Sequence, residues 1–256
     1  MTVKSNIYQA LYRLDLFLRR QPGPLILSYH SLSASGWKYA VPLACFQAHI
    51  RLLLSTGWKP VSLGEINRYY SQKVSLPRLC FAVTFDDGFT SVLQAEKFLH
   101  RYRIRPALFV ITDPTRLEPG QISSSEPRLN WGQIRSLARS GWEIGCHSLT
   151  HPDFSRLTTP QLSRQTRTAK KLLEKQLGRT VPYFAYPKGR FSSAAVVAVK
   201  ASGFSLGLTV QPDYFKSSSH PWLLPRLGLE NWVTPDLFLP FISPAAVGLR
   251  RLKSRL

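Results

Sequence analysis

Four side chains in two short segments of the sequence have the types and spacing to bind a metal ion and activate water. Asp86 and Asp87 are the only adjacent acidic residues in the chain, and they end an apolar run before Gly88. His147 and His151 stand four residues apart. Two neighbouring carboxylates repel each other unless a cation holds them. Two imidazoles and one carboxylate leave coordination positions open for water and substrate, so the pattern favours a catalytic metal site.

Each half of this pattern also has a simpler interpretation. Asp-Gly is common in turns, so the carboxylate pair alone is equally typical of the end of a strand. The two histidines alone could be unrelated loop residues. Taken together, they favour metal-assisted hydrolysis, in which one aspartate binds the metal and the other accepts a proton from water.

Hydrolysis of an amide also requires a proton for the departing nitrogen, and His30 is the candidate donor. It follows the apolar run that begins at Leu25. A lone histidine after a strand is often structural. The expected position of His30 at the same rim as the other four side chains favours the catalytic interpretation.

Short apolar runs alternate with segments of helical periodicity along the chain, which indicates a parallel sheet with outer helices. We expect six strands, at residues 25–31, 79–87, 107–112, 142–147, 183–186 and 205–210. We expect helices at residues 44–55, 92–102, 131–140, 160–177 and 193–201, four of them followed by glycine. In a parallel barrel the carboxyl ends of the strands meet at one rim, which is where the candidate residues fall.

The composition predicts one domain with basic edges. A chain of 256 residues with 44% hydrophobic content can form a single sizeable core. We expect a basic amphipathic helix at residues 1–23, the main domain at residues 24–232 and a basic tail at residues 233–256. No signal peptide or transmembrane segment is recognised, so the expected location is cytoplasmic, with peripheral membrane contact as an option. The three cysteines lack CxxC spacing and lie in apolar stretches, as reduced buried cysteines do.

A formal net charge of +20 would attract nucleic acid, an anionic membrane surface or an acidic polymer. Single-stranded nucleic-acid binders interleave basic and aromatic residues along a strand or groove, and the sequence contains no such stripe. We therefore expect no nucleic-acid partner. An anionic membrane surface remains the partner that a basic amphipathic segment would suit.

The segments Thr84–Gly88 and His147–His151 resemble the first two motifs of the polysaccharide deacetylases, the NodB-homology family or carbohydrate esterase family four. The similarity continues through Leu25–His30, Asn130–Trp131 and Phe184–Gly189, and it covers about residues 24 to 230. The resemblance implies an α/β fold, a distorted (β/α) barrel of the NodB-homology type with parallel strands and outer helices. It also implies roles for the residues: Asp86 as the general base, and Asp87, His147 and His151 as ligands of a divalent metal. That metal is usually Zn²⁺, with Fe, Co, Ni or Mn as alternatives.

The chain departs from the common form of the family in its later motifs. It lacks the Arg-x-Pro-Tyr type motif and the C-terminal Leu-x-His. Its early Tyr-His and its Ala-Tyr-Pro resemble the branch that includes poly-N-acetylglucosamine deacetylases, in which the early histidine is the acid. That agrees with His30 as the acid and leaves His220 as the rival. Without the usual arginine, Arg226 or Lys188 could orient Asp86, although either could be a solvated surface charge.

Three residues are candidates for substrate contact. The rings of Trp131 and Tyr186 could form the wall of a sugar subsite, since aromatic faces suit pyranose rings. Core packing would explain Trp131 equally well. Arg226 is the third candidate, placed near the site by its expected pairing with Asp86.

The sequence therefore predicts a metal-dependent carbohydrate N-deacetylase acting on an N-acetylated polysaccharide or a lipid-linked N-acetylhexosamine. Two alternatives stay open. One is a deformylase, amidase or esterase that acts on another N- or O-acyl sugar. The other is a non-catalytic relative that binds polymer through its basic charge.

Overall fold

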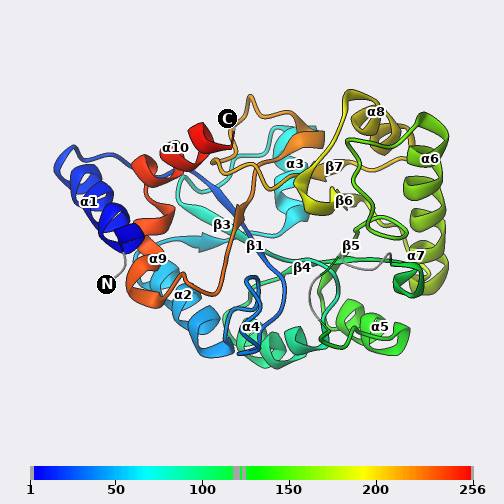
Figure 1. The fold of residues 1–256 in the computed structure, drawn as a ribbon, viewed down its shortest axis with the longest axis horizontal. Helices are drawn as coiled ribbons and strands as arrows, with labels where there is room; N and C mark the ends of the chain where they lie inside the picture. The colour runs from blue at the N-terminus through cyan, green and yellow to red at the C-terminus, as the bar shows by residue number, and fades with distance from the viewer. Residues whose placement is uncertain (1–2, 118–121, 123–124, 255–256) are drawn as a thin grey trace.

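The computed structural model describes residues 3–117, 122 and 125–254, and this part of the chain centres on a curled, eight-stranded parallel sheet (Figure 1). Neighbouring strands follow the order β7-β6-β5-β4-β3-β1-β8, with β2 beside β3, and every pair runs parallel. The strands are β1 (Leu25–Tyr29), β2 (Lys59–Pro60), β3 (Cys80–Phe85), β4 (Ala107–Val110), β5 (Glu143–Cys146), β6 (Tyr183–Ala185), β7 (Leu206–Leu208) and β8 (Leu227–Gly228).

Helices follow most of the strands and, apart from α3, pack on the outside of the sheet. They are α1 (Val3–Phe17), α2 (Leu43–Ser55), α3 (Leu63–Gln72), α4 (Glu96–Arg101), α5 (Trp131–Arg139), α6 (Thr159–Ser163), α7 (Ala169–Leu177), α8 (Ser193–Ala201), α9 (Pro235–Ile242) and α10 (Pro244–Lys253). A π-helical turn at Arg164–Thr168 joins α6 to α7 in one continuous rod. Alternation along the strands divides the core into two clusters. In β3, Phe81 and Phe85 pack against the outer helices, whereas Ala82 faces the interior of the barrel.

The two ends of the barrel differ, and the difference decides where a site can form. Helix α3 covers the amino-terminal end: the Glu143 carboxylate at the start of β5 accepts hydrogen bonds from the backbone N–H groups of Leu63 and Gly64, at 2.8 and 2.9 Å. This places a negative charge at the start of α3, where the helix dipole favours it. The carboxyl-terminal end is left open to the loops.

The segment before β8 links the two edges of the sheet. The backbone N–H of Leu224 donates to the Gly207 carbonyl at 2.8 Å, and the Thr209 N–H donates to the Leu224 carbonyl at 2.8 Å. These bonds bring β7 beside residue 224, two residues before Arg226. A sheet closed in this way points the Arg226 side chain into the barrel.

The predicted fold class, a parallel (β/α) barrel with outer helices, is confirmed. All six predicted strands are present, each ending one or two residues before its predicted end. The helix predicted at residues 92–102 begins as a 3-10 helix at Thr90–Ala95 before it becomes α4. The sequence interpretation missed β2, β8 and α3. Strands β2 and β8 have two residues each, too few for a periodic signal.

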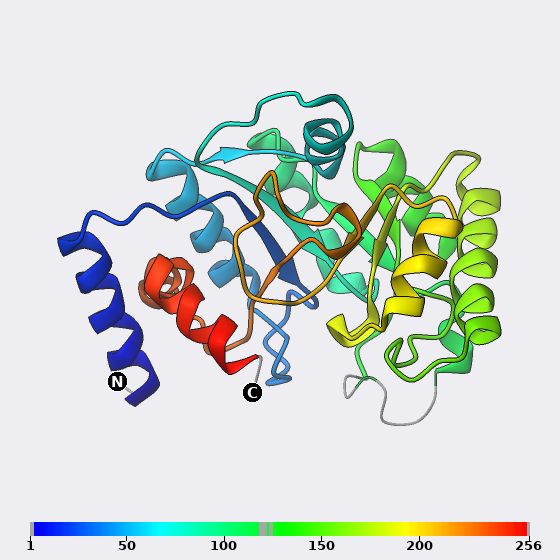
Figure 2. The same ribbon diagram turned by 90° about the horizontal axis from the view of Figure 1, so that it is seen from above.

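The N-terminal and C-terminal segments of the chain pack together. Helix α1 lies against α9 and α10, which fill most of residues 233–256, so this segment forms two packed helices where we expect a tail (Figure 2). Residues 1–2 of the expected N-terminal helix and residues 255–256 of the expected tail lie outside the described part of the chain. Within that part, none of the helices combines the length and apolarity needed to cross a bilayer.

Candidate active site

The open end of the barrel holds a cavity of about 580 Å³ whose lining brings together the residues expected to do chemistry. Most of them directly follow the end of a strand at this rim. Asp86 and Asp87 follow β3, His147 follows β5, and His30 follows β1. His151 lies in the loop after β5 and completes the group.

Asp87, His147 and His151 form a buried cluster suited to one metal ion. The Oδ1 atom of Asp87 lies 3.5 Å from Nε2 of His147 and 3.5 Å from Nε2 of His151. These separations are close to the edge of roughly 3.3 Å that tetrahedral N and O ligands make around zinc. Asp87 Oδ1 is buried and has no hydrogen-bond partner in the described residues, as expected of a ligand atom. The three residues are 2–4% exposed.

The loop after β5 is fixed by bonds that orient the two histidines. The Nδ1–H of His147 donates to the Ala185 carbonyl at 2.8 Å, which leaves Nε2 facing Asp87. The backbone N–H of His151 donates to the Ser148 hydroxyl at 2.9 Å. Gln165 accepts two further backbone N–H bonds from this loop, each of 3.1 Å. Such outer bonds set the tautomer and direction of metal-binding histidines.

The backbone at the cluster adopts conformations that side chains usually avoid. Asp87, Ser148, His151 and Lys188 all have positive φ, between 58° and 68°. Non-glycine residues rarely occupy this region, and they persist in it where the surrounding structure holds them for function. Four of the seven described non-glycine residues with positive φ lie at this cavity or in its loops.

Burial sets the charge of the cluster. Burial and the neighbouring Asp86 raise the pKa of Asp87 from 3.8 to about 7. Burial, followed by the charge of His147, lowers the pKa of His151 to about 2, and burial also lowers the pKa of His147. Both imidazoles are therefore neutral at pH 7, the form in which histidine binds metals. The donor set fits a divalent cation.

Asp86 is held by a fully buried arginine. Arg226 donates to Oδ1 of Asp86 at 2.8 Å and to Oδ2 at 2.7 Å, and it donates further bonds to the Thr84 hydroxyl at 3.0 Å and the Thr209 carbonyl at 2.9 Å. Although burial raises the pKa of Asp86, the Arg226 guanidinium, with smaller effects of His147 and His30, brings it well below its usual value. Asp86 is thus ionised and fixed in direction. Ser28 adds a longer bond of 3.3 Å to Oδ2.

His30 lies at the rim between aromatic rings. Its ring stacks on Tyr39 with centroids 4.9 Å apart and meets the edge of Trp37 at 5.8 Å. Burial, together with the charges of Arg226 and His147, lowers the pKa of His30 to about 4, against the opposing effect of Asp86. Its Nδ1 atom is buried without a hydrogen-bond partner among the described residues.

The loop that carries Trp37 and Tyr39 is tied to the segment after β4 by one carboxylate. Glu126 accepts hydrogen bonds from three serine hydroxyls of this loop. These are Ser31, Ser33 at 2.7 Å and Ser35 at 2.8 Å. Ser31 directly follows His30, so Glu126 fixes the wall of the cavity that faces this histidine.

The remaining sequence candidates are placed in different ways. Lys188 lines the cavity. Trp131 lines a smaller neighbouring hollow of about 300 Å³, which also includes Asp87. Tyr186 and Arg226 are 0% exposed and reach no open surface, so neither is placed to contact substrate in this structure. His220 is exposed, caps a short 3-10 helix and does not line the cavity.

Sequence reasoning missed several residues of the lining. Trp37 and Tyr39 had a detectable signal, since they are aromatic residues in a polar loop directly after His30. Glu230 and Arg250 also line the cavity. Arg250 lies on α10, about a hundred residues from His151, and no motif in the sequence connects the two.

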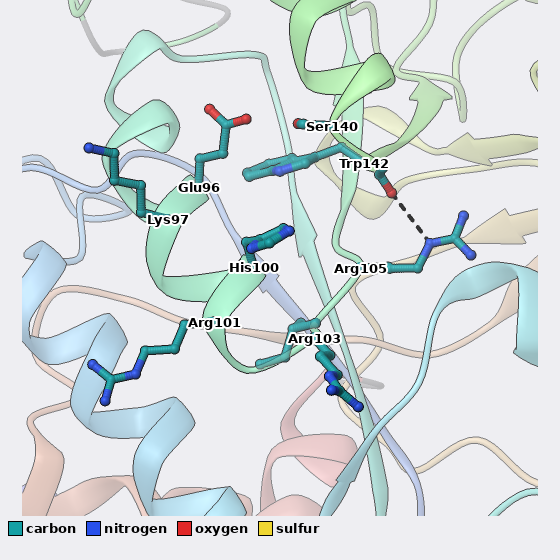
Figure 3. A pocket seen from close by; sticks show the side chains of 10 residues that line it. Glu96, Lys97, His100, Arg101, Arg103, Arg105, Ser140 and Trp142 are labelled. Atoms are coloured by element: carbon teal, nitrogen blue, oxygen red, sulfur yellow. Dashed lines mark hydrogen bonds between the residues drawn. The ribbon is translucent and has the colours of Figure 1, made fainter.

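A second cavity, of about 900 Å³, lies at the opposite, amino-terminal end of β4 and β5. Its lining is basic, but Lys97, Arg101 and Arg103 point away from one another (Figure 3). The Arg105 side chain donates a weak bond of 3.4 Å to the Gly141 carbonyl. Without converging polar groups, this hollow offers less for catalysis than the smaller one.

Comparison with known proteins identifies the family. The family model for polysaccharide deacetylase matches residues 73–207, just over half of the chain. The chain belongs to the polysaccharide deacetylase family. Members of this family hydrolyse N-acetyl amide bonds of carbohydrates, so the protein is a carbohydrate deacetylase, a hydrolase of non-peptide carbon–nitrogen bonds.

Relatives of this deacetylase extend the similarity over most of its length. YxkH of Bacillus subtilis, whose name places it among the polysaccharide deacetylases, is 26% identical over 218 residues, covering 85% of this chain and 75% of YxkH. The structure of IcaB from Ammonifex degensii matches with a TM-score of 0.74 and 25% identity, over 88% of this chain and 98% of IcaB. The Streptococcus pyogenes deacetylase PplD, in complex with acetate, shares the fold with a TM-score of 0.74 and 21% identity, over 88% and 100% of the two chains.

Proposed function

We propose that this deacetylase removes N-acetyl groups from N-acetylhexosamine units of a glycan, using a divalent metal held by Asp87, His147 and His151. The observation that carries the proposal is the position of Asp87 Oδ1. This atom is buried, has no hydrogen-bond partner among the described residues, and lies 3.5 Å from Nε2 of both histidines. Zinc is the ion that two imidazoles and one carboxylate suit best, with Fe, Co, Ni and Mn as alternatives. When bound, the metal would polarise the acetyl carbonyl and lower the pKa of water.

Asp86 is the proposed general base. Its carboxylate lies beside the metal ligands and is ionised, and the arginine fork fixes its direction. It accepts a proton from the water that attacks the acetyl carbonyl. Because Arg226 stabilises the charged form, the carboxylate is a weak base in the resting protein, so its position contributes more than its basicity.

His30 is the proposed acid. Cleavage of the amide needs one proton on the departing nitrogen, and the products are acetate and the free amine. With a pKa of about 4, His30 is neutral at pH 7, so it can donate only after it has gained a proton during the reaction. His220, exposed and outside the cavity, is the weaker candidate.

The wall around His30 supports a sugar as the substrate. Trp37 and Tyr39 present aromatic rings at the cavity, a surface that suits the apolar face of a pyranose. The candidates for that substrate are an N-acetylated polysaccharide and a lipid-linked N-acetylhexosamine. We place Trp131 in a neighbouring subsite, because its hollow shares Asp87 with the main cavity.

The test is acetate release from N-acetylglucosamine oligomers and from lipid-linked N-acetyl sugars, measured for the wild type, Asp86→Asn and the metal-depleted protein. We expect release by the wild type with one substrate class, about a hundredfold or greater loss in Asp86→Asn, and recovery of the depleted protein with zinc. Measurement of bound metal in Asp87→Ala is the matched control, since this change removes a ligand. A wild-type protein that binds metal but releases no acetate from either class would overturn the proposal.

A further inference from the structure

The outer face of α1 carries an apolar stripe that no described element covers. The inner face of α1 buries Ser5, Tyr8 and Asp15 toward α9 and α10. On the outside, Phe17 is 84% exposed and Leu14 is 44% exposed. Five of the ten large hydrophobic side chains exposed in the described part of the chain lie within residues 7–18. They are Ile7, Leu14, Leu16, Phe17 and Leu18.

The spacing of these side chains makes a continuous stripe. Ile7, Ala10, Leu14 and Phe17 follow one another at steps of three, four and three residues, which places them on one face of a helix. Leu18, four residues after Leu14, extends the stripe beyond the helix end. Figure 2 shows α1 at the edge of the molecule, with α9 and α10 on one side of it only. Contiguous exposed apolar surface of this kind marks an interaction site.

The charge beside the stripe has one sign. Arg13 and Arg19 flank it and are exposed, and Arg20, also exposed, lies 3.8 Å from the Asp15 carboxylate. Asp15 is the only acid of α1, and it is buried, where it accepts a 2.8 Å bond from the backbone N–H of Ala245. The outer face of α1 is therefore apolar and cationic, the combination that holds interfacial helices on anionic lipid. A second copy of the chain would bring the same arginines against each other.

We propose that α1 is a docking helix whose outer face inserts into the interface of an anionic lipid bilayer. The position of α1 relative to the cavity gives this docking a consequence. Tyr8 of α1 packs on Trp232 with ring centroids 5.6 Å apart, and the Trp232 indole donates to Glu230 at 2.7 Å. Glu230 lines the candidate active site. Docking through α1 therefore brings the cavity close to the membrane surface, where glycans anchored in lipid are presented.

Vesicle cosedimentation with the full chain tests the apolar part of the proposal. We expect the wild type to bind phosphatidylcholine vesicles that contain about one third phosphatidylglycerol, and to bind pure phosphatidylcholine far less. In Leu14→Ser/Phe17→Ser we expect the partition coefficient to fall about tenfold or more, because two exposed apolar side chains lose their insertion. Val197→Ser is the matched control, since Val197 is 66% exposed on α8, away from α1, and should bind as the wild type does.

A second pair of variants tests the charge. Arg13→Gln/Arg19→Gln should bind several-fold more weakly, whereas Arg101→Gln/Arg139→Gln, with the same loss of charge elsewhere, should retain most of the binding. All these side chains are exposed, so unchanged thermal unfolding should confirm the fold. The proposal is overturned if the wild type does not bind anionic vesicles. An equal loss of vesicle binding in both arginine double variants also overturns it. The same holds if the wild type binds no vesicles but forms a dimer that Leu14→Ser/Phe17→Ser dissociates. None of these readouts depends on deacetylation.

Discussion

Replacement of Arg226 by methionine tests the central electrostatic feature of the site. Arg226 and Asp86 are 0% and 2% exposed, so the pair is removed from water on both sides. Methionine keeps much of the volume over the Phe109 ring, which the guanidinium faces at 5.4 Å, but it removes the charge and all four hydrogen bonds of the side chain. Asp86 is then left as a buried carboxylate without its cation.

The expected cost follows from this unpaired charge. Removal of one partner of a buried ion pair destabilises a protein by about 3–5 kcal/mol. At this chain length 1 kcal/mol corresponds to roughly 2–4 °C in Tm, so we expect a decrease of about 10 °C.

The loss of stability caused by Arg226→Met should also depend on pH. In the wild type the pKa of Asp86 lies below its unfolded value of 3.8, so the stabilisation is present above that value and is lost on acidification. In Arg226→Met burial raises the pKa of Asp86, so stability falls as pH increases. The difference between the two proteins should therefore be larger at pH 8 than at pH 5.

Urea unfolding followed by tryptophan fluorescence at the two pH values measures the effect, and acetate release measures its catalytic consequence. Arg251→Met is the matched control. Arg251 also pairs with an aspartate, Asp213, at 2.9 Å, but its side chain is 43% exposed, so we expect a loss below about 1 kcal/mol. Asp86→Leu/Arg226→Met, which removes both charges, should recover most of the stability without activity. If Arg226→Met unfolds within about 1 kcal/mol of the wild type at pH 8, the ion pair does not hold Asp86 as we argue.

Three further predictions concern the parts that surround this pair. Because the pKa of Asp87 is raised to about 7, the metal-free protein should lose stability as pH rises from about 4 to about 7. Asp87→Asn should remove this loss and weaken zinc binding. Melting at several pH values and calorimetric zinc titration measure the two effects, and unchanged zinc affinity would contradict the ligand role. Glu126→Gln should loosen the loop that carries Trp37 and Tyr39, so we expect KM to rise several-fold with kcat nearly unchanged. A fall in kcat of the same size would contradict a role limited to substrate contact. Gly145→Ala would place a Cβ 2.4 Å from the Phe109 ring, so we expect a loss of about 1–3 kcal/mol in unfolding free energy, and wild-type stability would show that the barrel interior has room to adjust.

The strands and the rim were predictable because their signals are local. Strands β1 and β3 are buried along their whole length, and they appear in the sequence as apolar runs that contain one polar residue each, Ser28 and Thr84. The same runs end in His30, Asp86 and Asp87, so the barrel rule places these side chains together without coordinates. The spacing of His147 and His151 supplied the remaining members of the cluster.

The roles of Tyr186 and Arg226 show the limits of that reasoning. Tyr186 ends a strand like the other candidates, but side chains alternate between the two faces of a strand. Its ring packs with Phe154 and Phe184 at centroid distances of 6.2 and 5.2 Å. For Arg226, the sequence allowed either a surface charge or a partner of Asp86. The choice depends on the closure of the sheet at Leu224, which joins segments that carry no common motif.

The backbone strain at the site could not be predicted from the sequence for a related reason. Positive φ at Asp87 and His151 is unfavourable for each residue alone, and neither residue type announces it as glycine would. At His151 the conformation is accompanied by a 2.9 Å bond from the backbone N–H to the Ser148 hydroxyl, within the same loop. The two conformations direct a carboxylate and an imidazole to one point from loops that follow different strands. The residue types of a metal site can therefore be predicted from a chain, whereas the convergence of their ligand atoms is a property of the completed barrel.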